Sequence, residues 1–561
     1  MELDRRRFLQ GALASGALVA GSGLFGCAPK GSATEVLDET DETSWRAKPE
    51  EPSNVASTEE ADIIIIGAGN SGLTAAASAL DRGASVIILE SENDVQASRS
   101  WIGAIDSNLQ KEAGVSIDKN EAVNNICRFA SYTNDQRLVR KWADNSGEFM
   151  DWFIPVMESQ DLHVMLETAC KDSVYYNKEV AHHVYKGEYN PEGPNDFYHH
   201  TQALKSHVLS KGGDIRFQTP GALLAQDETG KVTGVYAKTS DDSYILFNAA
   251  KGVVVATGGF GNNEEMLDEL TTMAHRYCST NAGGERNVGM GMKMLIWAGA
   301  QLHPIQETMV FDRGTVMPGT ELGFPFSGGL WYGGSQPWLR VNEHGQRFFN
   351  EDQTYDYCFN AAVVQPGHTW WEVFDANYYA DCMRFQTARC SRVAMPAQGN
   401  APMICYLDGT TKLDETFLAN FLQQMLDSEA AVKADSLEDL AEAMGVPPQA
   451  FAQTVARNNE LWDKQSDEDF GKKATRLNPI KEGPFYAVHC AGWLLCTIGG
   501  VTVTPDLQPM REDGTPIEGV YVIGNDQGGF CSTVYPETFG GLQNGKGMTF
   551  GYLTGKALAT S

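Results

Sequence analysis

A glycine-rich turn after a short apolar run constrains this 561-residue chain more than any other feature. Residues 62–66 are mostly isoleucine, the pattern of a buried parallel strand. The turn that follows consists of Gly67, Ala68, Gly69, Asn70, Ser71 and Gly72, and an alanine-rich helical pattern comes next. The first glycine permits a tight turn, the second lets a pyrophosphate approach the backbone, and the third lets the helix pack on the strand. The spacing predicts a dinucleotide-binding βαβ unit.

Two further elements favour FAD over NAD as the dinucleotide. The next apolar run, residues 85–89, ends at Glu90, where a carboxylate can accept hydrogen bonds from ribose hydroxyls. Far along the chain, the strand pattern 520–523 is followed by a glycine and Asp526, an acid placed to bind a ribityl chain. A NAD domain needs no such second element. We expect one non-covalent FAD, with a close backbone approach to its adenosine half at Thr257, Gly258 and Gly259.

The N-terminus is typical of an export segment. Residues 4–10 resemble a twin-arginine signal, and residues 8–26 are apolar but rich in glycine, alanine and serine. The segment ends in Leu-Phe-Gly-Cys, which resembles a lipoprotein cleavage box and would place lipid on Cys27. The alternative is a plain signal with an unrelated cysteine. We therefore expect a signal over 1–27, an extracytoplasmic protein and a flexible acidic tether over 28–60.

Hydrophobic periodicity predicts an α/β chain: a Rossmann-like FAD-binding domain with an inserted α+β capping domain. We expect the FAD-binding domain over 61–332 and 496–561, and the capping domain over 333–495. Residues 163–200 are loop-like. Antiparallel strands are expected at 215–219, 222–226, 232–237 and 244–247, a buried strand at 252–256, and helices within 121–160 and at 413–428, 436–444, 448–464 and 546–559. The net charge of −30 argues against nucleic-acid binding.

Several motifs carry a resemblance to a known family. They lie at residues 256–262, 339–342, 345–352, 469–472, 484–487 and 524–526. On these residues the chain resembles the flavoprotein family of soluble fumarate reductases, urocanate reductases and 3-ketosteroid Δ1-dehydrogenases. The resemblance implies a mobile cap over an FAD domain, with the active site between them. It also implies further cofactor contacts at Ser91, Ser98, Gly103, Ala222, Leu223, Gly540, Gly541 and Leu542.

Departures from the family pattern predict that fumarate is not the substrate. Cys496 stands where soluble fumarate reductases carry a substrate-binding His, and Thr538 stands where they carry an Arg. Tyr379 lies near the position of the catalytic Arg, and Tyr355 near that of the assisting Arg. A buried dianion needs paired cationic donors, because an unpaired buried charge costs several kcal/mol.

Aromatic residues replace the lost cations and suggest a large, flat or apolar substrate. They are Trp331, Tyr332, Trp338, Tyr355, Tyr357, Trp370, Trp371, Tyr378, Tyr379 and Tyr535, of which we expect about half to be core only. By resemblance, Tyr535 hydrogen-bonds a substrate carbonyl and stabilises a developing enolate. The proton donor is expected to be Tyr379 or Tyr355, with Arg384 and Arg389 as rivals.

These features predict a flavin-dependent oxidoreductase that acts on CH–CH bonds. It would transfer a hydride from flavin N5 to the activated C=C bond of an enone, enoate or aromatic acrylate. One alternative is a ketosteroid-type Δ1-dehydrogenase that runs the reverse reaction, and another is a flavin-binding protein without turnover. The chain has no CxxCH haem motif, so a membrane or periplasmic cytochrome is the expected electron donor. The adjacent pairs His182–His183 and His199–His200 do not suit one metal site, and we expect none.

Overall fold

The computed structural model describes residues 44–95, 101–166, 180–188, 196–197, 200–282, 286–331, 333–385 and 415–561. The predicted signal, the lipidation site Cys27 and most of the tether lie outside these ranges, as do Ser98, Tyr332 and Arg389. Residues 48–561 form one compact unit. Within the described ranges, no helix has both the length and the apolar character needed to span a membrane.

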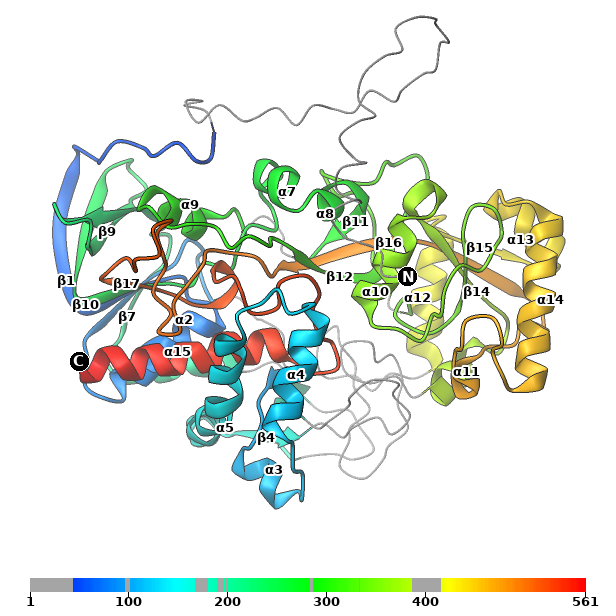
Figure 1. The fold of residues 1–561 in the computed structure, drawn as a ribbon, viewed down its shortest axis with the longest axis horizontal. Helices are drawn as coiled ribbons and strands as arrows, with labels where there is room; N and C mark the ends of the chain where they lie inside the picture. Colours follow the sequence, from blue (N-terminus) through cyan, green and yellow to red (C-terminus); the bar gives the residue numbers. More distant parts are fainter. Residues whose placement is uncertain are drawn as a thin grey trace, which may run out of the picture. The chain divides into compact units, whose positions relative to one another are not determined.

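A seven-stranded sheet carries the glycine-rich turn (Figure 1). Its order is β7-β2-β1-β10-β9-β8, with β17 paired to β10. Strands β7, β2, β1, β10 and β17 run parallel, and β8 and β9 form an antiparallel hairpin. Their bounds are β1 Val55–Ile66, β2 Val86–Leu89, β7 Asp214–Arg216, β8 Gly221–Gln226, β9 Val232–Lys238, β10 Tyr244–Val255 and β17 Val520–Val522.

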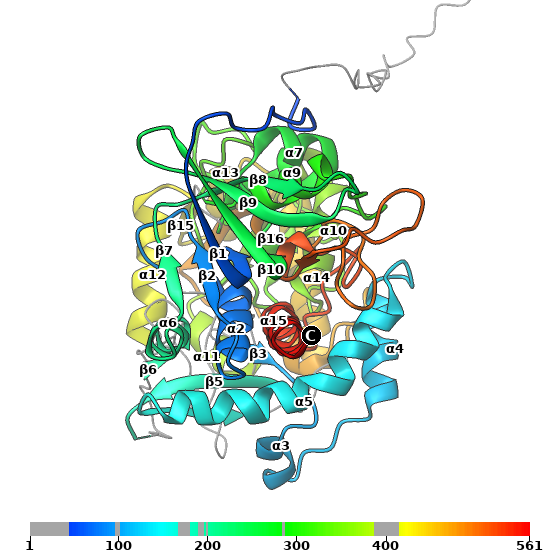
Figure 2. The same ribbon diagram turned by 90° about the vertical axis from the view of Figure 1, so that its left-hand side faces the viewer.

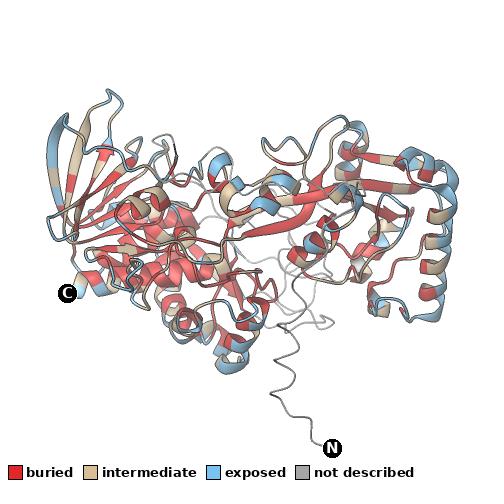
Figure 3. Cartoon of the chain, turned by 45° about the horizontal axis from the view of Figure 1, so that its top comes forward, coloured by how far each residue is buried: buried red, intermediate tan, exposed pale blue. Residues whose placement is uncertain are grey.

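Helices pack against this sheet, and the last four residues of both β1 and β10 are buried. Figure 2 shows α2 and α15 side by side, with α5 and α6 beyond them. These helices are α2 Asn70–Leu80, α5 Gln136–Glu158, α6 His200–Ser210 and α15 Leu542–Thr560. In Figure 3 the inner helix faces and the strand residues beside them are buried, whereas the strand ends at the left edge and the outer helix faces are half-buried or exposed. The predicted α/β class with a Rossmann-like core is confirmed.

A second, six-stranded sheet is built around one long strand, β16. Strands β11, β12, β14 and β15 all pair with it, and β13 pairs with β14. The strands are β11 Cys278–Asn281, β12 Thr308–Thr315, β13 Leu339–Val341, β14 Trp370–Phe374, β15 Ala431–Ala434 and β16 Phe485–Thr497. Five helices belong to this part of the chain: α10 Tyr355–Val363, α11 Tyr378–Phe385, α12 Glu415–Asp427, α13 Leu437–Met444 and α14 Pro448–Lys464. Because β11 and β12 precede residue 333, the second sheet is not made from the expected 333–495 segment alone.

A small third sheet and several short helices complete the described part of the fold. The sheet comprises β3 Ile102–Gly103, β4 Leu162–Leu166, β5 Ala181–Lys186 and β6 Asp196–Phe197. The remaining α-helices are α3 Asn108–Glu112, α4 Lys119–Phe129, α7 Glu264–Leu270, α8 Thr272–Tyr277 and α9 Met290–Trp297.

The structure differs from the sequence prediction at four places in these sheets. Strand β1 begins at Val55, within the expected tether, because its polar first half pairs with β10 while remaining largely exposed. The runs 244–247 and 252–256 form one strand, β10, apart from residue 256. Strand β7 pairs parallel to β2 instead of joining the antiparallel hairpin. Strands β4 and β5 lie in the segment expected to be loop-like.

Candidate active site

A cavity of about 810 Å³ lies where the carboxyl ends of β1, β2 and β10 meet the end of β16 and the start of α15. Ligands of open α/β sheets bind at this edge. The lining is drawn from distant stretches of the chain: residues 66–71, 89–92, 256–258 and 286–290, and Trp101, Pro220, Gly221, Ala282, Met309, Tyr355, Leu495, Cys496, Gly524, Asn525, Tyr535, Gly541, Gln543 and Asn544.

The glycine-rich turn is packed so that only its middle glycine faces open space. A Cβ atom at Gly67 would collide with the carbonyl oxygen of Ala256, and one at Gly72 would collide with that of Gly67. Gly67 also has a φ of +104°, which an L side chain rarely adopts. No atom outside its immediate neighbours lies within 4 Å of a Cβ built at Gly69. A phosphate can therefore approach the backbone at Gly69, while Gly72 serves packing and does not line the cavity.

The start of α2 and the carboxylate of Glu90 complete this end of the cavity. Helix α2 has Gly69 at its N-cap and no side-chain capping bond, so its first N–H groups are available to an anion. Glu90 Oε2 accepts a hydrogen bond from the backbone N–H of Ala68 at 2.7 Å, and Oε1 accepts one from Glu92 at 3.0 Å. Glu90 thus fixes the turn against the end of β2, and its contact with a ribose stays a prediction.

Asp526 does not line the cavity, contrary to the role expected for it. Its buried carboxylate accepts hydrogen bonds from the backbone N–H groups of Thr257, Gly258 and Gly259 and from the Thr257 hydroxyl. Burial raises the pKa of Asp526, and these donors act against that rise. The preceding residue, Asn525, lines the cavity instead, and its Oδ1 accepts a 2.8 Å hydrogen bond from Gln543 Nε2. Asp526 therefore shapes the 257–259 loop, a role that its position after a strand and glycine does not reveal.

The other expected cofactor positions divide between the cavity wall and the residues behind it. Ser91 and Gly541 line the cavity, and Pro220 and Gly221 line it immediately before Ala222. The backbone N–H of Gly103 donates to the carbonyl of Gly541 at 2.9 Å, so Gly103 packs β3 against the start of α15. Six expected positions do not line the cavity: Gly103, Ala222, Leu223, Gly259, Gly540 and Leu542.

The geometry of this cavity fits FAD. Its volume lies within the roughly 300–1,000 Å³ typical of cofactor and ligand sites. The open backbone at Gly69 and the uncapped start of α2 suit a pyrophosphate. Asn525, Gln543 and Asn544 also line the cavity, and side chains of this kind suit a ribityl chain or a flavin ring.

Two tyrosines form part of the wall at the far end of the cavity. Tyr355 begins α10 and Tyr535 precedes α15, and their rings stack with centroids 6.2 Å apart and planes inclined by 12°. Tyr355 also packs on Phe311 at 4.0 Å, and its hydroxyl lies 3.6 Å from the sulfur of Met309. The backbone N–H of Gln543 donates to the Tyr535 hydroxyl at 3.4 Å. Both expected tyrosines therefore come together at the cavity.

The other two expected catalytic residues do not lie at this cavity. Tyr379 is half-buried on α11 and packs against the core beneath the second sheet. The Arg384 guanidinium, on the same helix, donates to the carboxylate of Asp381 and to the carbonyls of Thr475 and Leu477. The Arg384 side chain therefore holds α11 against the 474–477 segment, which is a structural use of its charge.

Most of the predicted aromatic wall is protein core. Trp331, Trp338 and Trp370 are fully buried in one cluster, each with its indole N–H bonded to a glutamate or a carbonyl. Nine of these ten aromatic residues are described by the structure, and among those nine only Tyr355 and Tyr535 line the cavity. Trp101 also lines it and meets His183 edge-on at 5.3 Å. Trp101 stands outside every recognised motif, and no signal in the sequence pointed to it.

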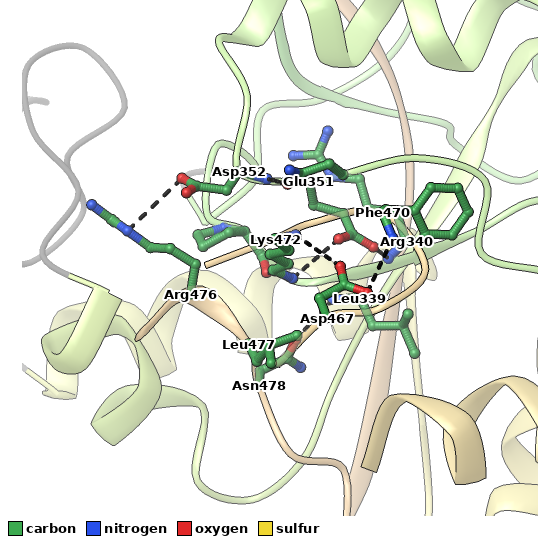
Figure 4. A network of polar contacts seen from close by, with 12 residues as sticks. Leu339, Arg340, Glu351, Asp352, Asp467, Phe470, Lys472, Arg476, Leu477 and Asn478 are labelled. Atoms are coloured by element: carbon green, nitrogen blue, oxygen red, sulfur yellow. Dashed lines mark hydrogen bonds and ion pairs between the residues drawn. The ribbon is translucent and has the colours of Figure 1, made fainter. Parts of the chain in front are cut away.

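Two of the family motifs meet in a buried ionic network away from the cavity (Figure 4). Glu351 accepts from the Arg347 guanidinium at 2.9 and 2.8 Å and pairs with Lys472 at 3.2 Å. Arg347 also binds Asp467 at 2.8 Å, and Arg476 reaches Asp352 at 3.8 Å. The side chains of Glu351 and Lys472 are completely buried. The buried network therefore gives these two motifs a structural role beside the second sheet, and neither motif lines the cavity.

The cavity lining contains fewer positively charged side chains than a dicarboxylate site needs. Among the lining residues that the structure describes, Arg286 is the only lysine, arginine or histidine. It is exposed and precedes Asn287, whose side chain lies beside Gly258 at the dinucleotide end. Cys496, at the end of β16, lines the wall where the family's His was expected. The described residues contain no cluster of three or more His, Cys, Asp or Glu side chains suited to a metal.

Comparisons with known proteins agree with this geometry. Residues 62–538 match the model of the FAD binding domain family. Over 512 residues the chain is 26% identical to the vinyl phenol reductase of Lactiplantibacillus plantarum, covering 89% of this chain and 96% of that protein. It is also 26% identical to the digoxin reductase of Eggerthella lenta, covering 95% and 93% of the two chains.

Solved structures show the same fold. The 3-ketosteroid Δ1-dehydrogenase of Sterolibacterium denitrificans superposes with a TM-score of 0.69 at 18% identity, covering 90% of this chain and all of that one. The open form of a flavocytochrome c3 fumarate reductase superposes with a TM-score of 0.63 at 22% identity, covering 92% and 82%. The family match spans most of the chain, so this protein belongs to the FAD binding domain family as a fumarate reductase-like flavoprotein oxidoreductase.

Proposed function

We propose that this chain is an FAD-dependent reductase of an activated C=C bond in a neutral or singly charged acceptor, such as an enone or an aromatic acrylate, and not of fumarate. One observation carries the proposal: two stacked tyrosines line the cavity, and the exposed Arg286 is the only lysine, arginine or histidine among the described lining residues. A dianion there would be buried without paired cations, which costs several kcal/mol. A carbonyl oxygen would instead accept from the phenols.

The roles of the chain's own residues follow from this placement. When bound, the FAD in its reduced form would supply the hydride for the β-carbon of the acceptor and would return to its oxidised form. Tyr355 and Tyr535 hold the acceptor's carbonyl oxygen and stabilise the negative charge that develops there. A tyrosine hydroxyl can also deliver the proton that the α-carbon requires. Leu495 and Trp101 supply apolar wall and limit the access of water.

A panel of acceptors tests this function. The flavin is reduced anaerobically with dithionite, and enones, cinnamates, urocanate, fumarate and 3-ketosteroids are then added in turn. We expect an enone or a cinnamate to reoxidise the flavin at least about 100-fold faster than fumarate, which corresponds to a difference near 2.7 kcal/mol in barrier height. Fastest reoxidation by fumarate would contradict the proposal. Reduction of the oxidised flavin by a saturated 3-ketosteroid, with no reoxidation by any enone, would support the reverse reaction instead.

We also propose that the chain works outside the cytoplasm and receives electrons from a separate cytochrome. The twin-arginine pattern at residues 4–10 and the Leu-Phe-Gly-Cys box at 24–27 support export and lipid attachment. The absence of a CxxCH motif in this sequence supports an external donor. We expect the wild-type chain in the membrane fraction and a Cys27→Ser variant in the soluble extracytoplasmic fraction. Cytoplasmic wild-type protein, or retention of an Arg5→Lys/Arg6→Lys variant in the envelope, would contradict this location.

A further inference from the structure

We infer, on the basis of the function proposed above, that Asp356 and Glu537 are positioning residues that hold Tyr355 and Tyr535 as a pair facing one acceptor oxygen. Neither acid lines the cavity. Asp356 instead binds the backbone of Tyr535, and Glu537 binds the backbone of Tyr355.

The two segments exchange hydrogen bonds reciprocally. Asp356 follows Tyr355 at the start of α10, and its Oδ2 accepts from the backbone N–H of Tyr535 at 3.2 Å. Glu537 lies two residues after Tyr535, and its Oε2 accepts from the backbone N–H of Tyr355 at 3.3 Å. Each tyrosine is therefore fixed at its main chain by an acid next to the other tyrosine. This arrangement couples the positions of two rings that come from segments 180 residues apart.

Both acids are buried where they bind the tyrosine segments. Asp356 and Glu537 are 4% and 6% exposed, and a carboxyl group is costly to bury without a partner. Burial raises the pKa of Asp356 well above its ordinary value, and the charges of Glu537 and Glu307 act in the same direction. Thr354, the N-cap of α10, makes no side-chain capping bond, so Glu537 supplies from a distant segment the acceptor that a local cap usually provides.

The bonds that the two acids make to backbone N–H groups make the inference testable. Asp356 uses both carboxylate oxygens: Oδ1 accepts from Val310 in β12 at 2.8 Å, and Oδ2 accepts from Tyr535. Asparagine would place an NH₂ group against one of these N–H donors. Glu537 makes its bond to Tyr355 through one oxygen, which glutamine retains. Asp356→Asn is therefore expected to disturb the pair, and Glu537→Gln is expected to preserve it while Glu537→Ala is not.

The experiment measures two properties of the FAD-loaded protein in each variant. The first is the rate of flavin reoxidation by the best enone of the acceptor panel. The second is the dissociation constant of cyclohexanone, which has a carbonyl but no C=C bond, followed by the change in flavin absorbance. We expect Asp356→Asn and Glu537→Ala to slow reoxidation about 10- to 100-fold, since misplacement by about 1 Å costs this much. Both should weaken cyclohexanone binding, and Glu537→Gln should restore what Glu537→Ala loses.

The same changes made in a Tyr355→Phe/Tyr535→Phe background separate positioning from general damage. If the acids act through the phenols, Asp356→Asn should slow reoxidation by a further factor of less than about two in the double Phe background. An equal loss in both backgrounds, or a Glu537→Gln variant as slow as Glu537→Ala, would overturn the positioning role. If Asp356→Asn retains no FAD, the Glu537 pair of variants decides the question. Glu512→Gln, in an exposed turn, is the matched control. A wild-type rate in the double Phe variant would instead refute the proposed function itself.

Discussion

Tyr535→Phe is expected to slow reoxidation of the reduced flavin by an enone about 100-fold, and Tyr355→Phe by a similar factor. Both phenols stand in the wall of the cavity, with stacked rings and buried side chains. Negative charge develops on the acceptor's oxygen as the hydride arrives, so a fixed donor there stabilises the transition state more than the ground state. The rate is measured anaerobically by stopped flow at the flavin absorbance band.

A double variant and a control variant on α10 test whether loss of the two hydroxyl groups causes the slower rate. Because both hydroxyls serve one oxygen, the double Phe variant should lose less than the product of the single losses. Tyr357→Phe, two residues along α10, changes a ring that stacks on Phe129 at 5.5 Å and does not line the cavity. It should stay within about twofold of the wild type. Unchanged rates in both single variants, with normal FAD content, would exclude the tyrosines from the chemistry.

Glu351→Gln is expected to lower the free energy of unfolding by about 3 kcal/mol, because removal of one partner from a buried ion pair leaves the other uncompensated. Burial lowers the pKa of Lys472 to about 8, and Glu351 is the chief influence that opposes this. Burial would raise the pKa of Glu351, but Lys472 and Arg347 outweigh it and lower that pKa. The transition is followed in urea by the fluorescence of the buried tryptophans near the second sheet.

Two further variants test whether the buried pair causes the loss. Glu351→Gln/Lys472→Met removes both members of the pair and should recover part of the stability. Glu460→Gln breaks exposed pairs with Arg457 and Lys464 on α14 and should cost less than about 1 kcal/mol. A loss in Glu351→Gln no greater than that in Glu460→Gln would mean that the network contributes specificity of packing and little stability.

Much of the nucleotide-binding core was predictable from local patterns. The isoleucine run of β1, the turn at Gly67 and the end of β2 at Glu90 follow from spacing alone, because each depends on residues adjacent in sequence. The helices α13 and α14 were expected within one residue of their observed bounds, since their apolar periodicity is strong. The polar half of β1 was missed because a strand exposed on its first residues shows no hydrophobic signal.

The roles of individual site residues were less predictable, because they depend on which way a side chain turns. Asp526 and Asn525 are adjacent, and the choice of which one faces the cavity is made by hydrogen bonds from the 257–259 loop. Arg384 was expected as a rival proton donor, but its guanidinium is held by Asp381 on the same helix and by two carbonyl groups 91 and 93 residues away. The aromatic residues predicted a wall suited to an apolar substrate. They did not reveal that Trp331, Trp338 and Trp370 form a separate core cluster.

Strand β16 has a consequence for how a substrate can enter. Its first half pairs with β14 and β15, and its last residues, which pair with β12, include Leu495 and Cys496 in the cavity wall. One strand thus runs from the centre of the second sheet into the binding site, and ladder hydrogen bonds hold it to its neighbours apart from a register shift at Leu495. Any opening movement must therefore carry this wall with the sheet or break the ladder between β16 and β12. A movement of the second sheet that admits the acceptor would therefore also move the part of the cavity wall that contacts it.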